Sequence, residues 1–262
     1  MNYGNYEYDL LVKLVESGDI FATREMIRFY LYDNKQDINL SPIDNQKILH
    51  YIKKLAMKGD GDAMLLLGSM YYSGEAGFVK QDFKKAAYWY EKSSKKGILD
   101  SSNNINTDSL TNLGYCYYYG RISKPDYKKA FFYYAKASIL KHPNSMYKIG
   151  DMYRKGLYVE KNVSTAIYWY RKAMRYCPRD SDYILASVGL RLGRCYLYGE
   201  GTKKSLMKAL NYLQLAERKF YKLAIDRPIA SNSIFVEEPL KIVHELLEVT
   251  RNEIKEGLFP QQ

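Results

Sequence analysis

The sequence predicts an all-α protein built from pairs of helices that repeat along the chain. Three observations lead to this prediction: a short motif recurs four times, glycine stands at the same places in every copy, and apolar residues between the glycines recur at helical spacing. The chain has 262 residues, 47% of them hydrophobic, which is enough for one large domain or two small ones. It has no run of about 20 apolar residues, so we expect no membrane-spanning helix.

The repeated motif is centred on a Leu-Gly or Ile-Gly pair. It reads LGSMYYSG at 67–74, LGYCYYYG at 113–120, IGDMYRKG at 149–156 and LGRCYLYG at 192–199. In every copy a tyrosine follows the first glycine by three positions, and a second glycine follows it by six. An alanine comes 16 positions after the first glycine, or 18 in the first copy, and an aromatic residue follows that alanine by three. Five matching positions in four copies indicate a structural repeat.

Each copy is predicted to contain two helices. The first should end at the second glycine, because a residue without a Cβ most easily adopts the left-handed conformation of a helix C-cap. The second should begin near Asp82, Asp126 or Asn162 in the first three copies, since such side chains cap free N–H groups. The first glycine is expected to let a neighbouring helix approach closely.

These residues resemble the Sel1-like repeat (SLR) family, whose repeat is related to the tetratricopeptide repeat. The first copy matches the family signature almost throughout, at Ala63, Leu67, Gly68, Tyr71, Gly74, Asp82, Lys85, Ala86, Trp89, Lys92 and Gly97. The later copies depart from it at Thr165, which replaces a lysine, and at Lys141, which replaces the closing glycine. The resemblance implies a right-handed superhelical solenoid of helix–turn–helix repeats, at about 60–97, 107–141, 143–177 and 186–220.

The ends of the chain are expected to close this stack. Residues 1–59 are predicted to form N-terminal helices that include a degenerate repeat. Residues 228–262 are predicted to form a linker and an acidic helix with one apolar face, made of Ile242, Val243, Leu246, Leu247 and Val249. A terminal cap needs such a face, since an open solenoid end would expose its core. The alternative, in which this helix folds back into a basic groove or pairs with another copy, stays open.

The resemblance also implies a concave surface, lined by the first helix of each repeat, that contacts ligands through a fixed set of positions. Tyrosine and arginine are frequent at those positions, and both residue types are enriched at binding hot spots. The partner-binding residues predicted in this way are Tyr72, Tyr115, Tyr118, Tyr119, Tyr147, Arg154, Arg194 and Tyr198. Asp151 occupies one of the positions as well. Since 28 residues are tyrosine, the rings can instead simply fill gaps between repeats.

Positive charge is concentrated in the middle of the chain. The net charge is +11 overall, and residues 61–228 hold 29 Lys and Arg against 14 Asp and Glu, a net of +15. Such a field favours acidic partners, which can be an acidic protein, a nucleic acid or an anionic membrane. The alternative is that lysine pairs such as 84–85 and 203–204 only form a solvated outer face.

No metal, cofactor or catalytic site is predicted, and we expect no enzymatic activity. Cys116, Cys177 and Cys195 lack C-x-x-C spacing, and the three histidines are scattered. Cys116 stands two residues after the first glycine, where other copies have Met70, Met152 and Cys195, so this position calls for a soft apolar filler. The chain also lacks the phosphate-loop, G-x-S-x-G and H-E-x-x-H motifs.

The sequence therefore predicts a protein–protein interaction scaffold or adaptor, which binds a partner segment on the concave face of the solenoid. Two alternatives stay open: binding of single-stranded RNA through the basic repeat surface, and an immunity or regulatory role dedicated to one partner. We expect a monomer. We also expect a cytoplasmic location, because the N-terminus lacks a basic region followed by an apolar stretch.

Overall fold

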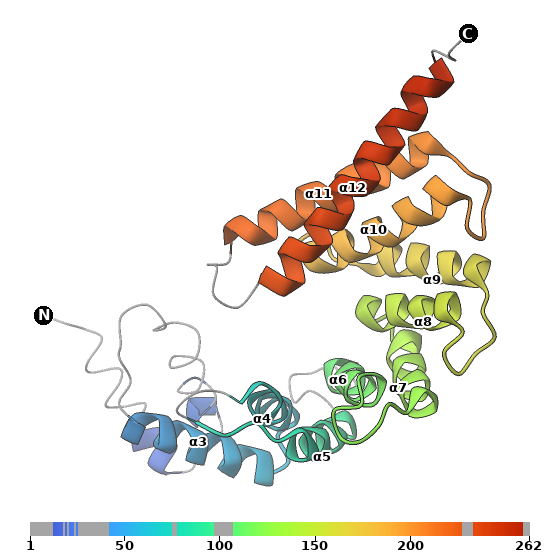
Figure 1. The fold of residues 1–262 in the computed structure, drawn as a ribbon. Coiled ribbons are helices and arrows are strands. Elements are labelled where there is room, and N and C mark those ends of the chain that lie inside the picture. The colour runs from blue at the N-terminus through green and yellow to red at the C-terminus, as the bar shows by residue number, and fades with distance from the viewer. Residues whose placement is uncertain are drawn as a thin grey trace, which may run out of the picture. The chain divides into compact units, whose positions relative to one another are not determined.

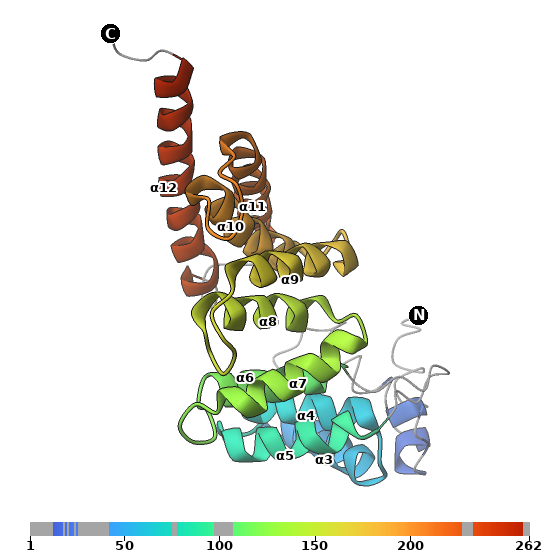
Figure 2. The same ribbon diagram turned by 90° about the vertical axis from the view of Figure 1, so that its right-hand side faces the viewer.

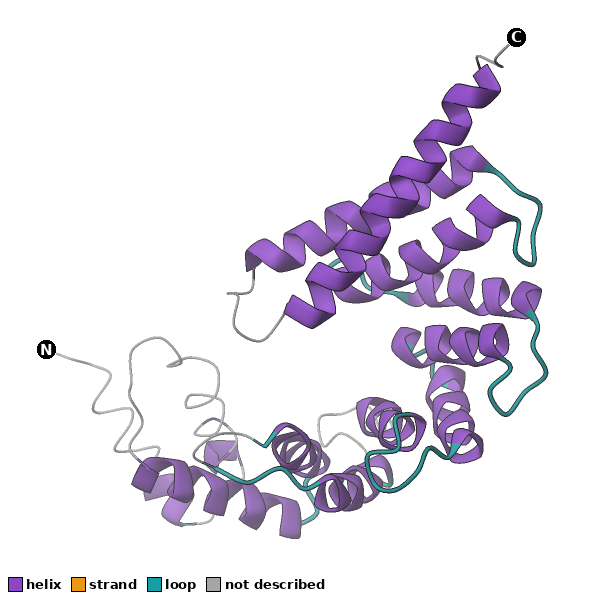
Figure 3. Cartoon of the chain, in the orientation of Figure 1, coloured by secondary structure: helices purple, strands orange, loops and turns teal. Residues whose placement is uncertain are grey.

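The computed structural model describes residues 13–17, 19, 21–23, 25, 42–74, 78–96, 107–226 and 233–258. Within these residues every regular element is a helix and there is no strand, which confirms the all-α prediction (Figure 3). The predicted N-terminal helices before residue 42 lie mostly outside the described residues. The described helices are α3 (Pro42–Met57), α4 (Gly61–Ser73), α5 (Phe83–Ser94), α6 (Thr107–Tyr118), α7 (Tyr127–Ile139), α8 (Pro143–Lys155), α9 (Val163–Tyr176), α10 (Asp182–Tyr198), α11 (Leu206–Asp226) and α12 (Ser233–Leu258) (Figure 1).

The chain divides into two compact units, Met1–Asp126 and Tyr127–Gln262, and each is described by itself. In the first unit α4 packs between α3 and α5, and α5 packs against α6. In the second unit α8 packs between α7 and α9, and α10 contacts α9, α11 and α12 (Figure 2). Consecutive helices are therefore neighbours in each unit, as expected for helix pairs in tandem.

The second glycine of each copy ends the first helix, as predicted. Gly74, Gly120, Gly156 and Gly199 have φ between +61° and +72°, the left-handed region that glycine adopts without steric cost. One backbone hydrogen bond then recurs in all four copies. The residue before the second helix donates its N–H to the carbonyl of the tyrosine three positions after the first glycine, at 2.8 to 2.9 Å, in the pairs Asp82–Tyr71, Asp126–Tyr117, Asn162–Tyr153 and Ser205–Tyr196. The hydrogen bond that joins the end of the loop to the first helix is thus repeated along with the helices.

The predicted helix starts are confirmed where the side-chain bond can be seen. Asp82 Oδ1 accepts from the backbone N–H of Lys85 at 2.9 Å, and Asn162 Oδ1 accepts from that of Thr165 at 2.8 Å. Each bond satisfies an N–H group that has no partner within the helix, which is why these residue types begin the second helix.

The first glycine of a copy makes room for a side chain of the second helix of the same copy. A Cβ added to Gly68 would lie 2.6 Å from the ring of Tyr90, and one added to Gly150 would lie 2.6 Å from that of Tyr170. Both tyrosines are buried, and each follows the alanine of its repeat by four positions. The repeat aromatic one position earlier, such as Trp169, is only half-buried. The core position is therefore the one that the sequence analysis did not single out.

Replacing Gly150 with alanine is expected to lower the free energy of unfolding by about 1–3 kcal/mol, the usual cost of overpacking a core. The new methyl group would press on the ring of Tyr170 and lie 3.1 Å from the carbonyl oxygen of Ala166, which cannot move far. Gly257→Ala is the matched control, because nothing lies within 4 Å of a Cβ at that position. Urea denaturation of both variants measures the effect, and an equal loss in the two would contradict the packing role of Gly150.

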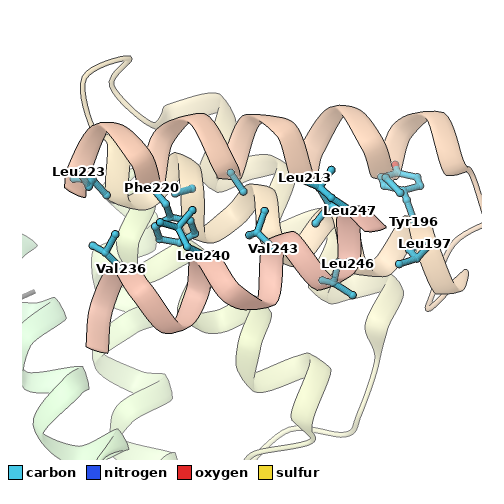
Figure 4. Close-up of a cluster of buried hydrophobic side chains, with 13 residues drawn as sticks. Tyr196, Leu197, Leu213, Phe220, Leu223, Val236, Leu240, Val243, Leu246 and Leu247 are labelled. Atoms are coloured by element: carbon cyan, nitrogen blue, oxygen red, sulfur yellow. The ribbon is translucent and has the colours of Figure 1, made fainter. Parts of the chain in front are cut away.

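The last helix, α12, lies along α11 in the second unit (Figure 4). Its buried side chains recur every three or four residues: Val236, Leu240, Val243, Leu246, Leu247 and Thr250. Val236, Leu240, Val243 and Leu247 pack with Leu213, Phe220 and Leu223 of α11. The prediction is wrong for two residues of the apolar face: Ile242 and Val249 are 42% and 39% exposed and do not belong to the buried side of the helix. These two residues are seven apart and therefore flank the buried stripe on one side of the helix.

Candidate functional site

An ion pair between a buried aspartate and a partly buried arginine joins three helices of the second unit. Arg191 of α10 donates two hydrogen bonds to Asp151 of α8, from Nε to Oδ1 at 2.6 Å and from Nη2 to Oδ2 at 2.7 Å. Tyr170 of α9 donates its hydroxyl to Asp151 Oδ1 at 2.8 Å. Arg191 Nη1 also donates to the carbonyl of Ser187 at 2.8 Å. Planar, bidentate pairing of this kind is the strongest geometry available to an arginine and a carboxylate.

The electrostatic surroundings keep this pair charged. Burial alone would raise the pKa of Asp151, but the charge and hydrogen bonds of Arg191, together with Lys148 and Tyr170, hold that pKa below its ordinary value. Burial opposes the charge of Arg191 as well, yet Asp151 raises the pKa of Arg191 above its ordinary value. Lys148 is also buried, and the loss of hydration lowers its pKa to about 8. Asp151 therefore ties α8 to α9 and α10.

Three predicted residues lie on the same first helices, α8 and α10, close to this pair. Arg154 follows Asp151 by three positions and Arg194 follows Arg191 by three, so each lies one helical turn further along its helix. Arg194 is exposed, and Tyr198 at the end of α10 is 51% exposed. Arg154 is half-buried, and its Nε has no hydrogen-bond partner among the described residues. That nitrogen is itself buried, so a partner would meet the exposed part of the Arg154 side chain.

Two predicted partner-binding residues lie in the interior, and this part of the prediction needs correction. Tyr147 is 1% exposed, and its ring lies 5.0 Å from the guanidinium of Arg191 and 5.3 Å from Lys148 Nζ. It supports buried cations through its ring face instead of facing solvent. Tyr118 is 8% exposed, with its ring edge-on to that of Tyr119 at 4.9 Å. Both side chains belong to the packing of the repeats.

The remaining predicted tyrosines belong to an aromatic cluster in the first unit. Tyr115 stacks on Tyr119 with ring centroids 6.1 Å apart, and Tyr72 meets Phe83 edge-on at 5.2 Å. Arg121 contacts both of these ring pairs: its guanidinium lies 5.4 Å from the ring of Phe83 and 6.0 Å from that of Tyr119. Burial raises the pKa of Tyr72, although a hydrogen bond and the charge of Arg121 oppose the rise. Tyr119 is 48% exposed, so it is the member best placed to contact a partner.

Arg121 is a residue of this cluster that the sequence analysis missed. It follows Gly120 directly, so the left-handed turn of that glycine brings its side chain back over the ends of neighbouring elements. One pattern in the sequence could have indicated this residue: a cation that closely follows four tyrosines within five residues, at 115 and 117–119.

The two cysteines at the filler position, Cys116 and Cys195, are core residues. Cys116 and Cys195 are buried, as expected for an apolar filler position, and burial raises the pKa of their thiols to about 12 and about 11. Met70 and Met152, at the same position of the other copies, are buried too. A thiol with so high a pKa is almost entirely protonated at neutral pH and is a poor nucleophile.

Several of the lysines considered for a basic surface have a carboxylate nearby. Lys85 pairs with Asp82 at 3.3 Å, Lys95 with Glu91 at 2.9 Å, and Lys204 with Glu253 at 2.5 Å. Exposed pairs of this kind contribute little to stability, about 0–1 kcal/mol, but they partly neutralise the charge of the lysine pairs. These three lysines therefore fit the alternative of a solvated outer face.

In the described parts of the chain, no three His, Cys, Asp or Glu side chains are grouped closely enough to hold a metal ion. None of the described helices is both long enough and apolar enough to cross a bilayer.

The chain is built from helix pairs in tandem, and in each copy a left-handed glycine ends the first helix. This arrangement places it in the class of α-helical repeat proteins. The family model of the Sel1 repeat matches four segments of the chain, 61–98, 107–142, 143–174 and 190–226. Together these segments make up more than half of the chain. The chain therefore belongs to the Sel1 repeat family, and the resemblance drawn from its motifs is confirmed. Proteins of this family typically mediate protein–protein interactions.

Two curated proteins are similar to parts of the chain. One is the ERAD-associated E3 ubiquitin-protein ligase component HRD3B of Arabidopsis thaliana, 29% identical over 154 residues, or 58% of this chain. The other is the chitin synthase regulator SKT5 of Saccharomyces cerevisiae, 29% identical over 127 residues, or 47% of this chain. The matched regions are 23% and 17% of those proteins, so the chain spans less than a quarter of their length.

Solved structures show the same fold. A Sel1 repeat protein from Oxalobacter formigenes is 22% identical with a TM-score of 0.63, and the match covers 95% of this chain and 98% of that one. The protective antigen c5321 of uropathogenic Escherichia coli, which displays an SLR fold, is 20% identical with a TM-score of 0.62. That match covers 97% of this chain and 51% of the antigen. Together they confirm the predicted fold class.

Proposed function

We propose that this protein is an adaptor that binds an extended or helical segment of a partner protein across the first helices of its repeats. Within this proposal the chain holds its partner in place and catalyses no reaction. The residues that would contact the partner in the second unit are Arg154, Arg194 and Tyr198. Tyr72, Tyr115 and Tyr119 of the first unit stay predictions. A monomeric state and a cytoplasmic location stay predictions.

The observation that carries the proposal is the pair of cations on α8 and α10. Among the described residues, no carboxylate oxygen lies within salt-bridge distance of Arg154 or Arg194, although Asp151 lies one turn away from Arg154. The Asp151–Arg191 pair uses up the nearby carboxylate and fixes α8 against α10. Two arginines on fixed helices, with an exposed tyrosine beside them, are the residue types that dominate binding energy at interfaces.

The relatives support the same kind of role. HRD3B is named as a component of a ubiquitin ligase, and SKT5 as a regulator of chitin synthase. Both names describe proteins that act on or with another protein, which agrees with an adaptor.

The test is a triple substitution within the second unit, Arg154→Ala with Arg194→Ala and Tyr198→Ala. Partners captured by the full chain from a cell extract are identified by mass spectrometry, purified, and measured against the variant by calorimetry. We expect a loss of affinity of at least about 100-fold, since hot-spot truncations cost about 2 kcal/mol or more each. The control variant changes Tyr88, Lys84 and Lys128 to alanine, all exposed on second helices. Equal binding by both variants would refute the proposal.

The two alternative functions are distinguished by the same reagents. If the chain binds single-stranded RNA, oligouridylate should bind at low salt with an affinity that falls steeply as salt rises. If it serves one dedicated partner, the extract should yield a single protein.

A further inference from the structure

A pocket lies outside the proposed partner-binding face, on the second helix of the third repeat. Its volume is about 660 Å³, and it is formed by the exposed side of α9 and the loop after α10. Ser164 donates its hydroxyl to the carbonyl of Gly201 at 2.8 Å, which ties the loop to the start of α9. A Cβ at Gly201 would lie 2.6 Å from the backbone N of Ser164, so this close approach requires glycine. The pocket wall is therefore held in place by specific contacts.

The pocket contains three cationic side chains and no acidic one. Arg171, Lys172 and Arg175 line it, together with Ser164, Ile167, Tyr168, Tyr176, Gly201 and Thr202. Among the described residues, no carboxylate oxygen lies within 4.0 Å of any of the three cations. This differs from Lys85, Lys95 and Lys204, each of which has a carboxylate partner. The positive charge of the pocket is thus left for a ligand to neutralise.

Aromatic rings hold two of these cations in place. Arg171 donates a hydrogen bond to the hydroxyl of Tyr196, and its guanidinium lies 5.8 Å from that ring. Lys172 Nζ lies 4.8 Å from the ring of Trp169 and 5.7 Å from that of Tyr168. A ring positions a cation without neutralising it, unlike a carboxylate. Binding of an anion would therefore require less ordering of these side chains than it would at free surface lysines.

The lining residues of α9 form one stripe on its exposed side. Tyr168, Arg171, Lys172, Arg175 and Tyr176 recur at intervals of three and four, which places them on a single face of the helix. The stripe is about 12 Å long at 1.5 Å per residue, and about four residues of extended chain cover that length. At one end, Lys141 Nζ lies 5.6 Å from the ring of Tyr176 and adds a fourth cation.

We propose that this pocket binds a short acidic segment, of about four residues, of a partner protein. Arginine is well suited to carboxylates because its planar group donates two parallel hydrogen bonds. The two tyrosines at the ends of the stripe can pack against aliphatic or aromatic side chains between the carboxylates. A nucleic acid strand is disfavoured, because four cations along about 12 Å reach few phosphates, whereas tight binding proteins make about six to ten such contacts. The site is independent of the first-helix face.

The experiment uses the full chain and fluorescein-labelled hexaglutamate, with binding followed by fluorescence anisotropy at about 50 and about 150 mM salt. We expect binding at both concentrations, weaker at the higher. The double variant Lys172→Gln with Arg175→Gln should weaken it by at least about tenfold. Lys84→Gln with Lys128→Gln is the matched control: it removes the same two charges from exposed positions outside the pocket, and it should change affinity by less than about twofold.

A second readout tests the same contact without removing charges. In a Trp89→Phe chain, Trp169 is the remaining tryptophan, and hexaglutamate should change its emission by drawing Lys172 away from the ring. Three results would overturn the proposal: equal weakening in both double variants, which indicates only an overall field; no binding at the lower salt; or tighter binding by oligouridylate that displaces the peptide. The proposed adaptor function would survive each of them, since it depends on other residues.

Discussion

Replacing Arg191 with methionine is expected to lower the free energy of unfolding by about 3–5 kcal/mol, because the change leaves the carboxylate of Asp151 buried without its cation. Asp151 is 4% exposed and receives two of its hydrogen bonds from Arg191. Denaturant titration followed by circular dichroism measures the loss. Lys95→Met is the surface control, since the Lys95–Glu91 pair is exposed, and it should cost less than about 1 kcal/mol.

The loss in the Arg191 variant should depend on pH in a defined direction. In the native protein the pKa of Asp151 is lowered, so its contribution to stability is present above the ordinary carboxyl pKa of 3.8 and is lost as the pH falls through the lower, folded value. Without Arg191, burial should instead raise that pKa. The difference between native protein and variant should therefore shrink from about pH 7 to about pH 5, as the unpaired carboxyl takes up a proton.

A double variant separates the lost attraction from the cost of an isolated charge. Arg191→Met combined with Asp151→Asn removes the buried charge as well, and it should recover more than half of the stability that Arg191→Met loses. If the double variant is as unstable as the single one at every pH, the ion pair is not what makes Arg191 important, and the packing of its side chain against Tyr147 is the cause instead.

Removal of residues 236–262 is expected to have the second large effect. It would expose the face of α11 now covered by Val236, Leu240, Val243, Leu246 and Leu247 of α12 (Figure 4). Burial of such side chains contributes about 1.5–3 kcal/mol each, so the sum approaches the whole stability of an ordinary domain. We expect loss of cooperative unfolding in the last repeat and aggregation through the opened face, measured by thermal melting and light scattering.

A point substitution makes this prediction specific in case the truncated chain cannot be purified. Val243 is fully buried and its neighbour Ile242 is 42% exposed, so Val243→Asp and Ile242→Asp place the same charge one residue apart. The first should destabilise by at least about 2 kcal/mol and the second by less than about 1 kcal/mol. The rival interpretation makes α12 an inhibitor folded over a binding surface. It would gain support if Val243→Asp left stability unchanged and strengthened partner binding.

The parts of the fold that local chemistry decides could be read from the sequence. Gly74 and Gly156 end helices because their φ is positive, and Asp82 and Asn162 begin helices because their side chains reach N–H groups three residues away. The core position of Tyr170 was missed for a different reason. Its burial depends on the space left by Gly150 on another helix, and no pattern within α9 distinguishes it from half-buried Trp169.

In the candidate sites, too, features set by local sequence could be predicted, whereas those set by contacts between distant segments could not. Tyr147 was assigned to a binding face from its place in the repeat, but two cations that come to lie against its ring, one of them 44 residues away at Arg191, bury it instead. The stripe of α9 is visible in the sequence as YWYRKAMRY at 168–176, with aromatic and basic residues at helical spacing. That it lines a pocket depends on the loop at Gly201, and only the folded chain brings the two together.

The Asp151–Arg191 pair also fixes the order of the repeats. Asp151 follows the first glycine of the third repeat by one, and Arg191 precedes that of the fourth by two. Exchange of these two repeats would place Arg194 and Lys148 at the two positions that now hold Asp151 and Arg191, so two like charges would meet at the junction. Asp151 would then stand at the end of the array without its partner. A chain with these two repeats exchanged is therefore expected to be less stable at this junction.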